Sequence, residues 1–375
     1  MDEQLQGRAL RSTVTADGRL RISLETIRLD EPGPDEVIVR VEATPINPSD
    51  LGLLLGPADI ATMRTEEGAE GPALVADIPA ERRRSVEARI GQPMPVGNEG
   101  AGTVVRAGAN AAGLLGRKVG MIGGGMYTQY RKLPAAACAL LPAGASPADG
   151  AAMFVNPLTA LGFVETMKAE GHSALVHTAA ASNLGVTLNR ICLADGIPLV
   201  NIVRSEAQAE SLRAIGARFV VDSTAPDFRA QLIDAIAETG ATLGFDAVGG
   251  GTLAGQMLDA MEAAAARGSK GFSIYGTASR KQVYIYGSLD PSPTIIDRSF
   301  GLTWGLGGWL LTPFLQKAGA ETAARLRQRV ADELLTTFAS RYTAVISLSD
   351  VLRPAVAAAY QKKATGEKYL IDPTR

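Results

Sequence analysis

Histidine and cysteine, the side chains that most often act as nucleophiles, general bases or metal ligands, are scarce in this sequence. Its 375 residues include His172, His177, Cys138 and Cys192, with no C-x-x-C pair. A catalytic zinc site needs three protein ligands and a structural one needs four, and neither histidine is near a cysteine in the sequence. We therefore expect no zinc, no hydrolytic Cys–His pair and no disulfide framework, and a structural or solvent-facing role for each histidine.

The segment LVHTAAASNLGV, residues 175–186, has the spacing of a cofactor site. It reads as a buried strand, a turn of small residues and a helix, which is where dinucleotide-binding proteins place their phosphate loop. Such loops usually read G-x-G-x-x-G, whereas this turn has one glycine, Gly185. Alanine and serine are nearly as small, Ser182 can donate its hydroxyl to a phosphate oxygen, and Asn183 tolerates left-handed backbone angles. The turn can therefore bind a pyrophosphate, although an ordinary strand–helix connection has the same signature.

The end of the next strand, Asn201–Ser205 (NIVRS), indicates which dinucleotide would bind. An NAD site usually has Asp or Glu about 20 residues after the turn, where it binds the ribose hydroxyls. Arg204 instead suits the 2′-phosphate of NADP. The alternative is a solvated arginine at the start of a helix. We predict NADPH as the cofactor, with NADH possible.

The elements around this turn alternate regularly. From about residue 150, continuous apolar strands are separated by helices of ~10–15 residues, a pattern typical of a parallel sheet covered on both faces. Residues 8 to about 150 contain short alternating strands with glycine and proline between them, as in a small antiparallel barrel. A helix over 321–340 and two strand-like pieces, TAVISL and KYLIDP, can complete this first domain. The fold class is therefore α/β, with a doubly wound parallel sheet and a β-barrel.

Residues 58–95 depart from the barrel pattern and read as an insertion. Its first part is loop-like, and its second part, PAERRRSVEARIG, reads as a charged helix. The cluster Arg82-Arg83-Arg84 lies in that helix between Glu81 and Glu87. We interpret it as a solvated helix face, with a phosphate-binding patch as the alternative.

Charge and hydropathy exclude several classes of partner. Lys and Arg number 37 and Asp and Glu 39, so no basic excess would attract nucleic acid or an anionic membrane, and a small-molecule substrate is expected. The N-terminus, MDEQLQGRAL, is polar and acidic, unlike a signal peptide. No uncharged apolar run approaches the ~20 residues that span a bilayer. These features, with two isolated cysteines, predict a cytoplasmic location.

Four segments resemble the medium-chain dehydrogenase/reductase superfamily, and the resemblance covers nearly the whole chain. They are Ile46–Asp50 (INPSD), Gly97–Gly102 (GNEGAG), Asn156–Ala160 (NPLTA) and Asp246–Gly250 (DAVGG). Zinc-dependent members have Cys near the first segment and His in the second, where this chain has Asn47 and Asn98. The chain therefore resembles the zinc-free branch, which includes the NADPH:quinone oxidoreductases and the 2-enoyl-thioester reductases. The combination GNEG, VNPLTA, SNLG and NIVR is most similar to the enoyl-thioester reductases.

The resemblance implies two domains and a dimer. Residues 1–152, completed by 312–375, would form a GroES-like catalytic domain, and residues 153–311 a Rossmann dinucleotide-binding domain. Parallel sheets of this superfamily often pair edge to edge through the last strand, so a homodimer is expected.

The resemblance also implies the cofactor contacts. Asn156 and Thr159 would lie near the nicotinamide and its ribose, and Arg204 and Ser205 would face the 2′-phosphate. The pyrophosphate would be wrapped by Ala181, Ser182, Asn183 and Leu184. The remaining contacts, most of them around the nicotinamide, would come from Val248, Tyr286, Gly287, Ser288, Leu289, Trp309, Leu310 and Lys368. Glu206 replaces a second basic residue of the family, which implies a modest preference for NADPH.

The substrate half of the resemblance is weaker. Enoyl-thioester reductases have a catalytic tyrosine shortly after the N-P-S-D segment, where this chain has about Ala58. A second aromatic residue that lines the family's pocket corresponds to Tyr127. We predict Asn47 and Tyr127 as catalytic candidates, because an amide or a phenol can donate a hydrogen bond to a substrate oxygen. The alternatives are an Asx turn before Pro48 and simple packing of the tyrosine.

A zinc-free site would reduce a substrate by placing its acceptor carbon against the reduced nicotinamide. Quinones and conjugated enones suit this arrangement, since their own conjugation spreads the developing negative charge. We therefore predict a zinc-independent, NADPH-dependent reductase of quinones or other conjugated carbonyls. The alternatives are a 2-enoyl-thioester reductase and a non-catalytic NADPH-binding sensor.

Overall fold

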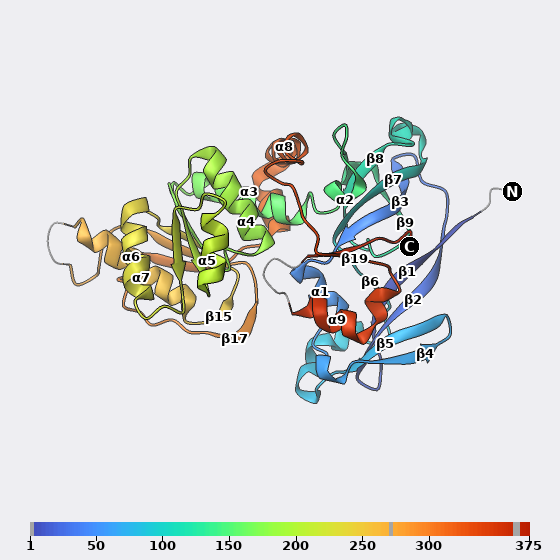
Figure 1. Cartoon of the computed structure of the whole chain (residues 1–375), viewed down its shortest axis with the longest axis horizontal. Coiled ribbons are helices and arrows are strands. Elements are labelled where there is room, and N and C mark those ends of the chain that lie inside the picture. Colours follow the sequence, from blue (N-terminus) through green and yellow to red (C-terminus); the bar gives the residue numbers. More distant parts are fainter. Residues whose placement is uncertain (1–3, 270–272, 363–367) are drawn as a thin grey trace. The chain divides into compact units, whose positions relative to one another are not determined.

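The computed structural model describes residues 4–269, 273–362 and 368–375. The chain forms two compact units: Met1–Val155 together with Arg327–Arg375, here the barrel unit, and Asn156–Leu326, here the Rossmann unit. The sequence places these divisions at 152/153 and 311/312. The second division of the structure falls within a long helix, α8 (Leu311–Asp332). Each unit is described separately (Figure 1).

The barrel unit is built from two sheets that are largely antiparallel. A five-stranded sheet has the order β4-β5-β2-β1-β6, and a seven-stranded sheet has the order β10-β8-β7-β3-β20-β19, with β9 also paired to β3. Their strands are β1 (Leu5–Val14), β2 (Arg19–Leu29), β3 (Glu36–Pro45), β4 (Arg64–Gly68), β5 (Gly71–Asp77), β6 (Met94–Pro95), β7 (Glu99–Ala107), β8 (Lys118–Ile122), β9 (Tyr130–Pro134), β10 (Cys138–Leu140), β19 (Ala344–Ile346) and β20 (Tyr369–Ile371).

The C-terminal segment completes the barrel unit through β19 and β20. The two strands are parallel to each other, and β20 lies antiparallel to β3, with Leu370 opposite Pro45 and Ile371 opposite Thr44. They correspond to the strand-like pieces TAVISL and KYLIDP, so this expectation is confirmed. The short helices of the unit are α1 (Pro48–Leu54), α2 (Pro147–Gly150), α9 (Pro354–Gln361) and the 3₁₀ turns η1 (Ile60–Thr62), η2 (Ala80–Arg89), η3 (Ala109–Leu114), η4 (Ala135–Ala137) and η5 (Asp350–Leu352).

The insertion at residues 58–95 is more ordered than the sequence predicts. The expectation of a loop in its first part is wrong: β4 and β5 form a hairpin, and β5 pairs with β2, with Leu74 opposite Ile22 and Ala76 opposite Leu20. All four of these side chains are buried in the core of the barrel unit. The charged helix is present, but as the 3₁₀ helix η2 rather than an α-helix. Burial of the β5 side chains against β2 explains why the hairpin joins the sheet.

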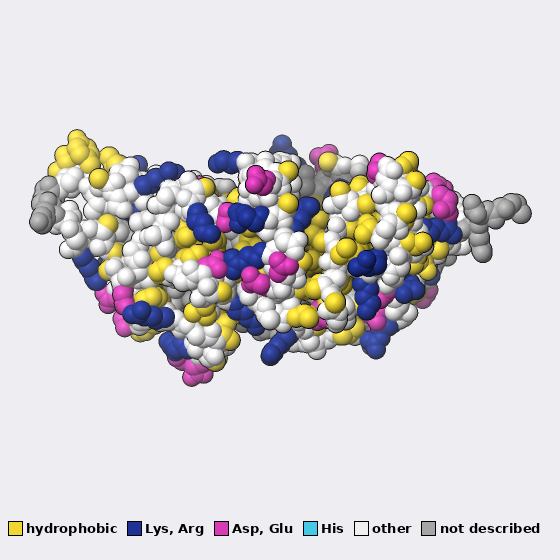
Figure 2. All heavy atoms as spheres, turned by 90° about the horizontal axis from the view of Figure 1, so that it is seen from above, with side chains coloured by type: hydrophobic (Ala, Val, Ile, Leu, Met, Phe, Trp, Pro, Cys, Tyr) yellow, Lys and Arg dark blue, Asp and Glu magenta, His cyan; other side chains and the backbone are white. Residues whose placement is uncertain are grey.

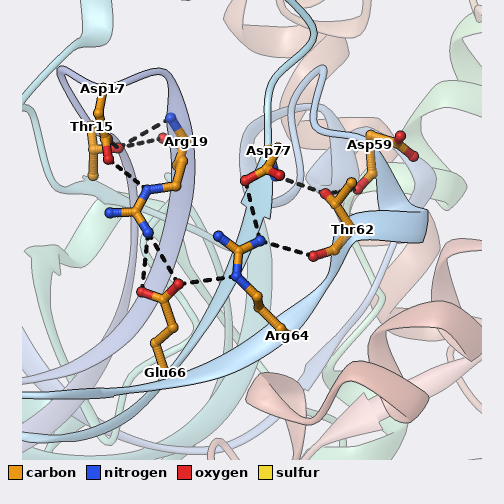
Figure 3. A network of polar contacts seen from close by, with 8 residues as sticks. All are labelled: Thr15, Asp17, Arg19, Asp59, Thr62, Arg64, Glu66 and Asp77. Atoms are coloured by element: carbon orange, nitrogen blue, oxygen red, sulfur yellow. Dashed lines mark hydrogen bonds and ion pairs between the residues drawn. The ribbon is translucent and has the colours of Figure 1, made fainter.

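Ion pairs fix the hairpin to β2 on the solvent side (Figure 3). Glu66 on β4 lies between two arginines, 3.1 Å from Arg19 Nη1 and 3.1 Å from Arg64 Nε. Arg64 Nη1 also lies 3.2 Å from Asp77 at the end of β5, and Arg19 Nε lies 2.7 Å from Asp17. Because these charges are partly exposed, each pair contributes little stability, and the network mainly favours one pairing of the strands.

The Rossmann unit contains six parallel strands covered on both faces. Their order is β13-β12-β11-β14-β16-β18, which is 3-2-1-4-5-6 when they are numbered in chain order, the doubly wound arrangement of dinucleotide-binding domains. The strands are β11 (Leu175–His177), β12 (Leu199–Val203), β13 (Phe219–Asp222), β14 (Leu243–Asp246), β16 (Lys281–Ile285) and β18 (Trp304–Gly308), and β15 (Gly249–Gly251) pairs separately with β17 (Asp290–Thr294).

Helices pack on both faces of the parallel sheet, against apolar side chains of its strands. Helices α6 (Phe228–Thr239) and α7 (Leu253–Arg267) pack on one face, which presents Val176, Val200 and Val283. The other face carries α3 (Val155–Ala169), α4 (Asn183–Asp195) and α5 (Glu206–Arg213). The prediction of a parallel sheet with helices on both faces is therefore confirmed.

Lys and Arg side chains are interspersed with Asp and Glu on the face that Figure 2 presents. Across the described ranges, no helix combines the length and apolar composition needed to cross a bilayer.

Candidate functional site

The strand order of the Rossmann unit reverses between β11 and β14, and ligands of such sheets bind beside this point, at the carboxyl ends of the strands. The two loops that leave these strands are joined by the buried side chains of Thr178 and Asp246. Thr178 Oγ1 donates to Asp246 Oδ1 at 2.7 Å and accepts from the Ala247 N–H at 2.8 Å. Asp246 also accepts from the N–H groups of Val248 and Gly249, at 2.9 and 3.1 Å. These hydrogen bonds therefore hold the two loops together before any ligand binds.

The turn after β11 has the backbone of a phosphate loop, although it has one glycine. Ala179 has φ 49°, and in the described ranges it is the only residue other than glycine with a positive φ. A Cβ on Gly185 would lie 2.2 Å from the Ala180 carbonyl oxygen, so only glycine lets the helix approach the turn this closely. Ser182 caps α4, its hydroxyl accepting from the Gly185 N–H at 3.1 Å. The tight turn and the close approach that glycines usually provide are thus both present.

The first N–H groups of α4 have no partners within the helix, and a phosphate is a suitable acceptor for them. Of the predicted residues, Ala181 and Ser182 lie on this turn, and Asn183 and Leu184 are the first residues of α4. The turn is held against β12 by the Ala180 N–H, which donates to the Ile202 carbonyl at 3.1 Å. The observed geometry fits a dinucleotide pyrophosphate, which favours a phosphate loop over an ordinary connection.

Arg204 and Ser205 follow β12 beside the same turn. Ser205 caps α5, and its hydroxyl accepts from the Gln208 N–H at 3.4 Å. The Arg204 side chain is exposed, while its N–H donates to Gln208 Oε1 at 3.1 Å. Glu206 Oε1 forms an ion pair with Nη1 of Arg213, the last residue of α5, at 2.5 Å. Among the described residues no carboxylate pairs with the Arg204 guanidinium, so this group can bind a phosphate next to the turn.

The loop after β16 brings together five of the predicted cofactor residues. The N–H groups of Tyr286, Leu289 and Asp290 donate to the carbonyls of Asp246, Ala247 and Val248, at 2.9, 3.2 and 2.9 Å. A Cβ on Gly287 would lie 2.5 Å from the Ala247 carbonyl oxygen, which explains the glycine there. The loop therefore holds Val248, Tyr286, Gly287, Ser288 and Leu289 together at the carboxyl end of β14.

His177 contacts this loop through Tyr286. Its Nε2 lies 2.8 Å from the Tyr286 hydroxyl, and the two rings stack with their centroids 5.8 Å apart. Burial lowers the pKa of His177 to about 3, so the ring is neutral at physiological pH. The structural role expected for this histidine agrees with its position. His172 bonds Thr242 Oγ1 at 2.7 Å, and both residues precede the amino ends of the central strands β11 and β14.

Asn156 and Thr159 lie in the first turns of α3, and Thr159 is buried. Trp309 follows β18, and its indole N–H donates to Thr166 Oγ1 on α3 at 3.1 Å, while its ring packs edge-on against Phe163. Leu310, next to it, is 65% exposed. These four predicted residues therefore lie on α3 and on the segment that packs beside it.

The barrel unit contains a cluster of buried polar residues around the start of α1. Glu99 is fully buried, and its carboxylate accepts from Asn47 Nδ2 at 2.8 Å and from the N–H groups of Phe154 and Val155 at 2.8 and 2.9 Å. Asp50 accepts from the Asn47 N–H at 2.8 Å and the Asn98 N–H at 2.9 Å. The two carboxylates thus join the segments that contain Asn47 and Asn98.

Burial controls the charges in this cluster. It raises the pKa of Asp50 to about 7, and the nearby charge of Glu99 adds to the rise. It also raises the pKa of Glu99 itself, an effect that Lys368 opposes. The Lys368 ammonium is buried 5.4 Å from the centre of the Tyr342 ring and 3.5 Å from Ser340 Oγ, and burial lowers its pKa to about 8. Glu99 is a site residue that the sequence analysis missed, and only its position in the resembling segment GNEGAG marked it.

Tyr127 lies in the apolar core of the barrel unit, 1% exposed, and its hydroxyl donates to the Pro45 carbonyl at 3.1 Å. Burial raises the pKa of this phenol well above its ordinary value. Asn47 is the residue that precedes α1. The hydroxyl of Tyr127 therefore donates to a backbone carbonyl of the barrel unit, and the side-chain amide of Asn47 donates to Glu99.

No group of three or more His, Cys, Asp or Glu side chains in the described ranges is arranged to bind a metal ion. The residues that replace the family's zinc ligands, Asn47 and Asn98, donate to Glu99 and to Ser49 Oγ (3.1 Å) instead.

Comparison with known proteins agrees with both units. Residues 33–143 match the alcohol dehydrogenase GroES-like domain. Over 100% of both chains, the protein is similar to the crystal structure of a candidate NADPH:quinone reductase from Mesorhizobium loti, with 26% identity and a TM-score of 0.73. The chain belongs to the medium-chain dehydrogenase/reductase superfamily.

Two further relatives come from the reductases of enoyl thioesters. A mitochondrial 2-enoyl thioester reductase heterodimer from Candida tropicalis shares the fold, with 19% identity, a TM-score of 0.67 and coverage of 98% of this chain and 100% of that one. A mitochondrial enoyl-[acyl-carrier-protein] reductase from Xenopus tropicalis is 27% identical over 210 residues, which are 53% of this chain and 51% of that protein. The match thus spans about half of the curated relative.

The positive φ of Ala179 gives a test of the turn in this medium-chain dehydrogenase/reductase. We expect Ala179→Gly to stabilise the protein by up to about 1 kcal/mol, because a left-handed conformation costs an L-residue roughly 1–2 kcal/mol and glycine's extra freedom in the unfolded chain offsets part of that gain. Ala180→Gly is the matched control, since Ala180 is buried without a positive φ and should lose about 0.5–1 kcal/mol. Urea unfolding measures both, and a less stable Ala179→Gly variant would contradict the assignment.

The raised pKa of Asp50 predicts a pH-dependent effect of Asp50→Asn. The folded pKa of about 7 lies above the unfolded value of 3.8, so the native state holds an extra proton between these pH values and loses stability as pH rises toward 7. The asparagine variant lacks this loss. Its destabilisation relative to wild type should therefore be larger at pH 5 than at pH 8, as measured by urea unfolding. Asp149→Asn, which removes a cap from the Ser146 N–H, is the control, and an Asp50→Asn difference that stays constant with pH would refute the prediction.

Proposed function

We propose that this protein is a zinc-independent reductase that transfers hydride from NADPH to a quinone or another conjugated carbonyl. The observation that carries the proposal is the turn after β11, whose tight backbone, close helix approach and neighbouring exposed Arg204 together fit the pyrophosphate and 2′-phosphate of NADPH. The full-length similarity to a candidate NADPH:quinone reductase supports it.

The predicted contacts are retained as proposals for the bound cofactor. Ser182 and the N–H groups of Asn183 and Leu184 would bind the pyrophosphate, and Arg204 with Ser205 the 2′-phosphate. The loop from Tyr286 to Leu289, with Val248 beneath it, would support the nicotinamide ribose. When bound, NADPH supplies the hydride, and the protein supplies position and exclusion of water.

Asn47 and Tyr127 are assigned positioning roles in this proposal. The amide of Asn47 fixes Glu99 and the start of α1, and the phenol of Tyr127 fixes the end of β3 through Pro45. Since the acceptor is conjugated, its own electrons spread the negative charge that develops on hydride addition. A strong external acid or a metal is then less necessary than it is for a simple ketone.

A 2-enoyl-thioester reductase is the second candidate, favoured by the similarity to the Xenopus tropicalis relative. The position where that class has its catalytic tyrosine is about Ala58. In this protein Ala58 is 6% exposed and packs in the core of the barrel unit. This alanine has no donor group, which is why we place the conjugated carbonyls first.

We also propose a homodimer and a cytoplasmic location. β18 is an edge strand of the Rossmann sheet, rich in glycine, and Leu302 and Leu310 beside it are 69% and 65% exposed. Pairing of two such edges would cover these side chains. Cys138 and Cys192 are both free thiols, as expected in a reducing compartment.

NADPH oxidation with a panel of quinones, beside crotonyl-CoA, tests the function. We expect turnover with at least one neutral quinone and less than one zinc per chain by elemental analysis. Turnover with crotonyl-CoA alone would establish the second candidate. Tight NADPH binding with neither activity would favour a sensor, and stoichiometric zinc would contradict the proposed mechanism.

Arg204→Gln should separate the two nicotinamide cofactors. Loss of a charge-assisted contact to the 2′-phosphate should raise the Kd for NADPH about 10- to 100-fold and leave the Kd for NADH unchanged. Arg218→Gln is the matched control, because Arg218 is also exposed but precedes β13 and pairs with Glu238. Fluorescence titration measures the four values, and equal weakening of both cofactors by Arg204→Gln would exclude the proposed contact.

A further inference from the structure

Tyr342 differs from the other tyrosines whose hydroxyls lie inside the protein. It belongs to the barrel unit, two residues before β19, and its ring is partly exposed. In the described ranges its hydroxyl is the only buried hydroxyl without a hydrogen-bond partner, whereas those of Tyr127, Tyr284, Tyr286 and Tyr360 all bond within the protein. A phenol removed from water without a bond costs free energy that phenylalanine would not, so packing alone does not account for this hydroxyl.

The backbone holds Tyr342 beside Lys368. The Thr343 N–H donates to the Lys368 carbonyl at 2.9 Å, and the Lys368 N–H donates to Thr343 Oγ1 at 3.2 Å. The pairing of β19 with β20 begins at the next residues, with Ala344 opposite Tyr369. The Lys368 ammonium lies 5.4 Å from the centre of the Tyr342 ring. The phenol and the ammonium are therefore kept together by the strand pairing.

The Lys368 ammonium also has donors to spare. Of the three donors that an ammonium carries, one donates to a described residue, Ser340 Oγ, at the long distance of 3.5 Å. Glu99 acts on this charge, but its two oxygens already accept from Asn47 Nδ2 and from two backbone N–H groups. Two donor groups with unmet hydrogen bonds thus lie together, and one is cationic, which suits an oxygen that carries negative charge.

Both groups are protonated at neutral pH. Burial raises the pKa of the Tyr342 phenol, Glu99 and Asp149 add to the rise, and Ser340 opposes it. The pKa of Lys368, about 8, leaves its ammonium mostly charged below that pH. A neighbouring cation stabilises a phenolate, so this phenol can release its proton when negative charge develops on an oxygen next to it.

We propose that the Tyr342 hydroxyl gives the proton that completes the reduction to the substrate oxygen that becomes negative. The inference rests on the proposed reductase function, in which the Asn47 amide and the Tyr127 hydroxyl already donate within the barrel unit and leave the substrate without a proton donor. Hydride adds to the conjugated system, the π electrons move to the carbonyl oxygen, and this oxygen takes the proton as the Tyr342 O–H bond breaks. The phenolate then regains a proton from the Lys368 ammonium, which solvent recharges. The reaction consumes one NADPH and one solvent proton for each two-electron reduction.

A probe with a negative oxygen tests the site without turnover. p-Nitrophenolate spreads the charge of one oxygen into its ring, as the reduced substrate would, and nitrobenzene is its neutral counterpart. Both are titrated into the full-length protein with and without NADP⁺, by absorbance and by calorimetry. Tyr342→Phe should raise the Kd for p-nitrophenolate about 10-fold or more, because a hydrogen bond to a charged oxygen is lost, and should leave nitrobenzene within about twofold. The urea midpoint of this variant should be unchanged or higher, since an unsatisfied buried hydroxyl is removed.

Tyr369→Phe is the matched control, because Tyr369 directly follows Lys368 and its ring is also partly exposed. It should leave both Kd values and the turnover of a neutral quinone within about twofold, whereas Tyr342→Phe should lower kcat about 100-fold without changing the Kd for NADPH.

The proposal is overturned if wild type does not bind p-nitrophenolate, if Tyr342→Phe binds it as tightly as wild type, or if quinone turnover survives this substitution. It is also overturned if the variant weakens both probes equally and has a lower urea midpoint, which is the result of a purely structural role. Binding of p-nitrophenolate that depends on Tyr342, in a protein that reduces no conjugated carbonyl, would refute the reductase function and keep the binding site.

Discussion

The close contact between two loops at the centre of the parallel sheet is the constraint on which the proposed cofactor site depends. Asp246 is buried, forms no ion pair with any described Lys or Arg, and accepts hydrogen bonds from a hydroxyl and two N–H groups. That carboxylate fixes the loop after β14, Thr178 ties it to the loop after β11, and the segment from Tyr286 runs along it. Backbone N–H groups that are already fixed lose little entropy when an anion binds, which is the physical basis of preorganised phosphate recognition.

In the barrel unit, ionisable side chains of both signs are buried close together. Asp50, Glu99 and Lys368 are buried in one cluster, and no two of them form a direct ion pair in the described residues. Each carboxylate is satisfied mainly by backbone N–H groups, so the cluster fixes chain segments rather than opposite charges. Because burial brings the pKa values of Asp50 and Lys368 to about 7 and about 8, the total charge of this cluster changes within the physiological range. The affinity of the barrel unit for an anionic group should follow that change.

The sequence was most informative where local pattern and long-range structure agree. Apolar strands separated by regular helices predicted the parallel sheet, and the small residues between Leu175 and Gly185 predicted the turn. The hairpin β4–β5 was missed because Arg64–Gly68 (RTEEG) has no apolar alternation, and its conformation depends on β5 pairing with β2, which lies more than 40 residues earlier in the chain. The burial of Glu99, Asp50 and Lys368 was equally hidden, since these residue types are usually exposed.

The same hairpin makes one edge of the five-stranded barrel sheet differ from the β18 edge of the Rossmann sheet. At the edge of the barrel sheet, β4 presents Arg64, Glu66 and Glu67, charged residues that discourage another strand from adding to it. At the edge of the Rossmann sheet, β18 presents three glycines and carries no charge. Unwanted polymerisation of a β-rich protein proceeds through whichever edge is unguarded. The insertion therefore guards one edge of the five-stranded sheet against the addition of a strand from another molecule.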